Sequence, residues 1–121
     1  MVDLDLLEVR LLEAALAGQA ETYGSLLAFF ERRVTPVMVA ALCKDLGRVC
    51  ERIEAAGGPD LACLVVRKSD GLPGAGYFTS LREAGLYNGP PTGPAAERYV
   101  ARAQRRARAY VARLRRDARR S

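Results

Sequence analysis

Leu61–Gly71 has the sequence LACLVVRKSDG, and this stretch decides which fold class the chain favours. Its first eight residues, Leu61–Lys68, are rich in apolar and β-branched side chains, which is typical of a strand. Asp70–Gly71 follows, a pair that tolerates the positive φ angles of a hairpin turn. The returning arm, Leu72–Phe78, contains a proline and two glycines, so we expect an irregular edge strand there. The sequence therefore predicts a β-hairpin.

Three amphipathic segments precede the predicted hairpin, each with apolar residues at steps of three and four. The third has the clearest start, because Thr35 can cap it and Pro36 suits the first helical position. Its length allows either one continuous helix or two helices with a bend near Gly47. The expected helices cover residues 3–17, 23–32 and 36–56.

Three helices followed by a hairpin is the order of a winged-helix domain, in which a helix-turn-helix pair precedes a β-ribbon wing. We therefore expect an α+β, mostly helical fold with such a domain over residues 1–86. Turn-forming residues predict a linker over 87–94. Residues 95–121 are expected to form a long amphipathic helix, because their apolar side chains gather on one side and their arginines on the other.

The positive charge of the chain is concentrated in this last helix. The 121 residues hold 19 Lys+Arg and 14 Asp+Glu, a net charge of +5. Residues 1–96 carry 9 basic and 12 acidic side chains, a net of −3, whereas residues 97–121 carry ten arginines against two acids, a net of +8. Only a polyanion or an acidic protein surface would neutralise such a helix well. Its expected DNA contacts are Arg98, Arg102, Arg105, Arg113, Arg116 and Arg120.

The composition excludes several classes of function. The chain has no histidine, which removes the commonest general base and metal ligand. Its three cysteines, Cys43, Cys50 and Cys63, form no CxxC pair, so we expect reduced thiols in a cytoplasmic protein with no metal and no cofactor. No secretory signal and no apolar stretch of about 18 residues is visible, so no membrane association is expected.

Thr22–Ala28, with the sequence TYGSLLA, resembles the TYG-x-[LI]-A segment that opens the DNA-binding winged helix of O6-alkylguanine alkyltransferases and alkyltransferase-like proteins. Leu61–Val66 and Asp70–Gly71 resemble that family's apolar PCHRVV strand and the glycine turn after it, so the resemblance covers roughly residues 20–80. It implies a duplex-binding scaffold in which Tyr23 approaches a backbone phosphate. The alternative for Tyr23 is a purely structural role over the helix core.

The sequence departs from this family at the catalytic motif. The position of the family's nucleophilic cysteine is occupied by Ala62, and Cys63 is displaced by one residue. The proline, histidine and arginine of that motif are missing, and so is the arginine that the family's recognition helix inserts into the base stack. Cys63 therefore lacks a partner that would lower its thiol pKa, and alkyl transfer is only a remote alternative.

Further DNA contacts are expected along the helix-turn-helix pair and the wing. Lys44 and Arg48 lie one helical turn apart and share a face with Arg52, which makes either a basic ridge or an ordinary solvated surface. Thr35 can present a helix N-terminus to phosphate or serve only as a cap. The residues predicted to contact DNA in this domain are Tyr23, Arg32, Arg33, Thr35, Lys44, Arg48, Arg67 and Lys68.

The function expected from these features is non-enzymatic binding of duplex DNA, in a regulatory or architectural role. The acidic balance of residues 1–96 motivates an alternative, an interaction adaptor whose basic helix binds an acidic partner or a nucleoprotein complex. A protein partner or a homodimer would use the apolar face formed by Tyr99, Tyr110 and Leu114.

Overall fold

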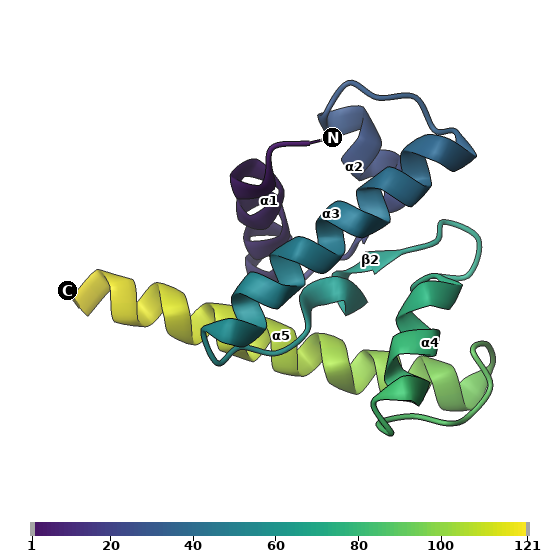
Figure 1. Cartoon of the computed structure of the whole chain (residues 1–121). Helices are drawn as coiled ribbons and strands as arrows, with labels where there is room; N and C mark the ends of the chain where they lie inside the picture. The colour runs from purple at the N-terminus through teal and green to yellow at the C-terminus, as the bar shows by residue number, and fades with distance from the viewer. Residues whose placement is uncertain (1, 121) are drawn as a thin grey trace.

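The computed structural model describes residues 2–120 and is mostly helical, with one small parallel sheet (Figure 1). The α+β, mostly helical class predicted from the sequence is confirmed. Residues 1 and 121, the outer limits of the predicted domain and final helix, lie outside the described part. The elements are α1 (Leu4–Ala17), β1 (Glu21–Thr22), α2 (Tyr23–Phe29), α3 (Pro36–Ala55), the 3-10 turn η1 (Leu61–Leu64), β2 (Val65–Val66), α4 (Ala75–Glu83) and α5 (Pro94–Arg120).

The helices begin where local capping chemistry predicts. The side chain of Asp3 accepts hydrogen bonds from two backbone N–H groups of α1, and Thr22 and Ser25 form a reciprocal capping box at α2. Thr35 caps α3, which continues without a break through Gly47. The predicted end of α2 near residue 32 is wrong, because Glu31 adopts a positive φ of 57° and the helix stops at Phe29.

The main core lies between α1, α3 and α5, with η1 and β2 at its centre. The apolar stretch Leu61–Val66 lies in the middle of the molecule, where four of its side chains are fully buried: Leu61, Cys63, Leu64 and Val65. β2 pairs with β1 in parallel, with Thr22 opposite Val66. The other core side chains are Leu7, Leu11, Ala15, Leu26, Leu27, Leu42, Leu46, Val49, Cys50, Ile53, Ala107 and Val111.

The predicted β-hairpin does not form within residues 61–78, and this expectation was wrong for a physical reason. The Asp60 carboxylate accepts a hydrogen bond from the Ala62 N–H at 2.9 Å, which starts a turn of 3-10 helix where a strand was expected. After Val66 a tight turn closes, with the Arg67 N–H donating to the Leu72 carbonyl at 2.8 Å. The expected returning arm then becomes α4.

A second, smaller cluster joins α4 to the first half of α5. Its buried members are Leu72, Phe78, Leu81, Ala96 and Val100, with Tyr77, Tyr87 and Tyr99 packed around them. Because α5 contributes side chains to both clusters, this one helix supports the whole molecule. None of the helices in residues 2–120 combines the length and the apolarity needed to cross a membrane.

Candidate functional site: a groove and an arginine tail

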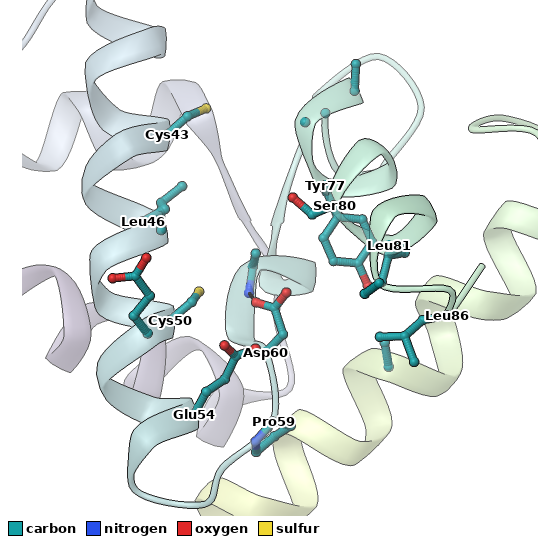
Figure 2. A pocket seen from close by; sticks show the side chains of 18 of the residues that line it. Cys43, Leu46, Cys50, Glu54, Pro59, Asp60, Tyr77, Ser80, Leu81 and Leu86 are labelled. Carbon is teal, nitrogen blue, oxygen red and sulfur yellow. Dashed lines mark hydrogen bonds between the residues drawn. The ribbon is translucent and has the colours of Figure 1, made fainter. Parts of the chain in front are cut away.

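A groove of about 1050 Å³ lies between α3 and α4. Figure 2 shows side chains of both helices facing each other across it, with Cys43, Leu46 and Cys50 on α3 opposite Tyr77 and Leu81 on α4. η1 lies beneath them, and α5 contributes further lining residues. Phe78 and Leu81 of α4 pack against α5, and the groove lies between α4 and α3.

Tyr23 connects α2 to the start of α4 at the rim of this groove. Its hydroxyl oxygen accepts a hydrogen bond from the Gly74 N–H at 2.9 Å. Burial raises the pKa of Tyr23, so the hydroxyl keeps its proton and can donate it to an acceptor. A Cβ added at Gly74 would lie 3.0 Å from this hydroxyl oxygen, so a larger residue there would require Tyr23 to shift. The half-buried Tyr23 therefore has a structural role together with a position on the groove.

One end of the groove carries three carboxylates, Glu51, Glu54 and Asp60, which we call the acidic end. Burial and the neighbouring charges of Asp60 and Glu51 raise the pKa of Glu54. The side chain of Asp60 already accepts the Ala62 N–H, while Glu51 and Glu54 are exposed. A positive group bound here would relieve the repulsion among these carboxylates.

The thiols near the groove are all held in their protonated form. Cys43 is exposed, yet partial burial of its thiol raises its pKa. Burial, together with the nearby Asp60, raises the pKa of Cys50, and the same two causes raise that of Cys63 to about 12. Cys63 is completely buried, with its Sγ 3.6 Å from the Asp60 carbonyl oxygen. Among residues 2–120, no group of three or more cysteines and acids has the geometry of a metal site.

The predicted basic ridge on α3 is interrupted by acidic neighbours. Arg48 lies 3.9 Å from Asp45, and Arg52 donates to Asp5 of α1 at 2.8 Å. Arg67, expected at a wing tip, instead makes two hydrogen bonds to Asp70 at 3.2 and 2.8 Å, and these hold the pKa of that carboxyl below its usual value. These arginines mainly bind carboxylates of their own chain.

The remaining predicted residues of the domain are exposed but lie in different places. Arg32 and Arg33 precede α3, whose cap Thr35 accepts the Met38 N–H at 3.2 Å. Lys44 lines the groove together with Tyr23 and Arg67, at the end away from the acidic carboxylates. Lys68 lies in the turn after β2. The structure therefore brings Tyr23, Lys44 and Arg67 together at the groove, and the other five predicted residues of the domain lie outside it.

The C-terminal end of α5 extends beyond the rest of the molecule (Figure 1). All eight residues from Arg113 to Arg120, which we call the arginine tail, are exposed, and five of them are arginines. Earlier in the helix, Arg98, Arg102 and Arg105 are also exposed. The predicted arginine face of α5 is therefore accessible to a large partner along most of its length.

The apolar face of α5 is mostly occupied within the chain. Tyr99 packs against Tyr87 with ring centroids 5.0 Å apart, and Tyr110 contacts the backbone at Gly58 closely enough to exclude any side chain there. Leu114 remains 40% exposed. Of the three residues predicted to hold a protein partner, Leu114 is thus the accessible one.

Comparisons with protein-family models, with curated proteins and with solved structures find no match. The groove and the arginine tail are the two features of the structure that bear on function.

Sequence reasoning missed the groove and its acidic end. Glu51 and Glu54 are spaced to share a helix face, which is a usable signal, but Asp60 joins them only through the turn before η1. The strand expected over Leu72–Phe78 includes Tyr77, and the sequence gives no assignment for Leu81, so it predicts no wall opposite α3. Recognising α4 in the sequence would have been needed to predict this site.

Proposed function

We propose that this protein binds duplex nucleic acid, in particular duplex DNA, through the arginine tail of α5 and without catalysing a reaction. The observation that carries the proposal is that all eight tail residues are exposed on a helix that the core holds in place. An α-helix with side chains is about 10–12 Å wide, and the major groove of DNA is about 12 Å wide. A helix end of this kind can enter the groove and direct its arginines to phosphates on both sides.

The rest of the chain is proposed to contribute weaker contacts. In the winged-helix interpretation, α2 and α3 form the helix pair that docks on the duplex, and the turn after β2 takes the place of a wing. Arg32, Arg33 and the N-terminus of α3 are exposed and could bind phosphate, which supports this docking. The net charge of −3 over residues 1–96 argues that this part adds less affinity than the tail.

Binding is proposed to be independent of base sequence. Residues 113–120 contain no asparagine or glutamine, so base contacts there would be limited to arginine with guanine, and we expect phosphate contacts to dominate. The nearest glutamine, Gln104, donates to the Cys63 carbonyl at 2.9 Å and is thereby held against the core. An architectural role fits phosphate contacts better than recognition of a defined operator.

The test is a fluorescence anisotropy titration of the full chain with a labelled duplex over a range of salt concentrations. Five phosphate contacts predict a slope of log K against log salt of about −4.5. Replacing the five tail arginines by glutamine should remove most of that slope. Absence of binding at low salt, or a slope unchanged by the replacement, would refute the proposal. A duplex RNA of the same length distinguishes general duplex binding from a preference for DNA.

A second candidate function is an adaptor that holds an acidic protein partner. The observation that favours it is that Arg48, Arg52 and Arg67 are occupied by carboxylates of the chain itself, so the body offers few positive groups to a duplex. An acidic polypeptide that displaces duplex from the tail at equal charge concentration would support the adaptor. The complete burial of Cys63 and its raised pKa support leaving alkyl transfer out of both proposals.

A further inference from the structure

We infer that this protein assembles head to tail, with the arginine tail of one copy bound in the groove between α3 and α4 of the next. The inference adds a second binding partner for the tail and does not depend on duplex binding. It rests on the chemistry of the groove, on the matching chemistry of the tail, and on the path of α5.

The groove offers both an apolar wall and negative charge. Leu46 and Leu81 line it from opposite helices, and Leu86, which is 64% exposed, extends the apolar surface at its rim. The acidic end lies beside this wall, and Figure 2 shows Glu54 of α3 and Asp60, just before η1, projecting into the space between α3 and η1. Positive groups that line the groove include Lys44 of α3, Arg67 and Arg106 of α5.

The tail has the complementary arrangement. Leu114 and Ala118 lie one helical turn apart and form a short apolar stripe. Arg115 lies beside this stripe, with Arg119 one turn further, whereas Arg116 points to the opposite side of the helix. Eight helical residues span about 12 Å, or roughly two turns. With the stripe on the apolar wall, Arg115 and Arg119 face the acidic end.

The partner must be another copy because of the path of α5. Tyr99, Ala103 and Arg106 of this helix line the groove of their own copy. The helix continues unbroken from there to Arg120 and carries the tail away from that groove, past the C-terminal end of α3 (Figure 1). The tail could reach its own groove only if α5 broke, so docking joins two molecules.

Because the interface joins two different surfaces of the chain, it can add copies one after another. The assembly is an open filament unless the rotation between copies closes it into a ring. An open assembly of this kind has one free groove at one end and one free tail at the other. The interaction depends on exposed charges, so added salt should weaken it.

Sedimentation velocity of the full chain at low salt tests this arrangement. The mean mass should rise with protein concentration and fall when salt is added. Glu51→Gln/Glu54→Gln removes two of the three carboxylates of the acidic end, and Arg115→Glu reverses one of the two charges that face it, so each variant alone should stay monomeric. Arg116→Glu is the matched control, since it makes the same charge change on the far side of the tail and should assemble like the parent. All substituted positions are exposed, and circular dichroism checks that the variants fold.

Mixing the two defective variants gives the sharpest result. Arg115→Glu keeps its groove and Glu51→Gln/Glu54→Gln keeps its tail, so the mixture should form dimers and nothing larger, because the tail of the Arg115→Glu variant gains no opposite charge in the neutralised groove. A parent chain that remains monomeric at every concentration, or equal assembly of the Arg115 and Arg116 variants, overturns the inference. Duplex binding is measured separately on the same variants. It should fall equally in the Arg115 and Arg116 variants, which separates failure of this inference from failure of the proposed function.

Discussion

At the scale of single residues, the contact between Tyr23 and Gly74 joins segments 51 positions apart. It is the hydrogen bond that ties α2 to the start of α4, whose N-terminus has no side-chain cap. The resemblance to alkyltransferases draws attention to the same tyrosine as a phosphate contact. In this structure the Tyr23 hydroxyl accepts the Gly74 N–H and so holds the start of α4, which forms one wall of the groove.

Tyr23→Phe should lower the free energy of unfolding by about 1–3 kcal/mol, because the Gly74 N–H loses its partner in a part-buried place. Urea denaturation measures the change. Tyr87→Phe is the control, since its hydroxyl donates to the exposed Pro90 carbonyl and its loss should have a smaller effect. Equal effects of the two substitutions would contradict the role assigned to Tyr23.

Thiol labelling of the folded protein should modify Cys43 first and leave Cys50 and Cys63 protected until the chain unfolds. The thiolate is the reactive form, and burial raises the pKa of Cys43, so its labelling rate should still be rising above pH 9, where an ordinary thiol approaches its maximum. Mass spectrometry after timed labelling identifies the modified residue. Rapid labelling of Cys63 at neutral pH would reopen the enzymatic alternative.

At the scale of elements, the sequence predicted the helices better than the segment between α3 and α5. The starts of α1, α2 and α3 depend on side chains such as Thr22 and Thr35, which cap the N–H groups a few residues away. The stretch from Leu61 to Phe78 depends on distant partners. Leu61, Cys63 and Leu64 are buried in the main core and form a turn of 3-10 helix, although the same residues favour a strand, and only Val65 and Val66 form one.

The candidate site could be predicted only where it depends on local sequence. The arginine tail follows from helical periodicity and composition, and its exposure agrees with that prediction. The groove could be predicted only if α4 were predicted, and the Asp70–Gly71 turn signal favoured a hairpin in place of α4. Ion pairs such as Arg52 with Asp5 join different helices, so they cannot be predicted from the residues next to either partner in the sequence.

Two glycines of α3 and its following turn should respond oppositely to alanine. Gly47 is exposed in the middle of α3 with no atom near its added Cβ, so Gly47→Ala should stabilise the protein by roughly 0.5–1 kcal/mol. A Cβ at Gly58 would lie 2.6 Å from Ile53 and 2.7 Å from Tyr110, so Gly58→Ala should destabilise it. Thermal denaturation of both variants is the measurement. Stabilisation by Gly58→Ala would mean that α5 does not pack against this turn.

At the scale of the whole molecule, α5 has two parts: its first part packs in the core, and its last eight residues carry exposed positive charge. The first part of α5 belongs to the core through Ala96, Val100, Ala107 and Val111, and the arginine tail begins two residues after the last of these. Stability and polyanion binding are therefore expected to depend on different parts of the same element.

Removing residues 113–121 should leave the thermal midpoint nearly unchanged while abolishing duplex binding, because every buried residue of α5 is retained. Removing residues 106–121 also deletes Ala107 and Val111, and the core should then lose its cooperative transition. Differential scanning calorimetry distinguishes the two cases. A large fall in the midpoint for the shorter deletion would show that the tail supports the fold.

The parallel pair of β1 and β2 has a consequence for the order in which the chain folds. Glu21 and Val65 are opposite each other although they are 44 positions apart in the sequence, and the whole of α2 and α3 lies between them. Closing so long a loop costs chain entropy, and the few hydrogen bonds between two short strands do not offset that cost. The helical hairpin of α2 and α3 should therefore collapse first and bring the strand ends together. Docking of η1 and β2 then completes the centre of the core as a late kinetic event, after most secondary structure is present.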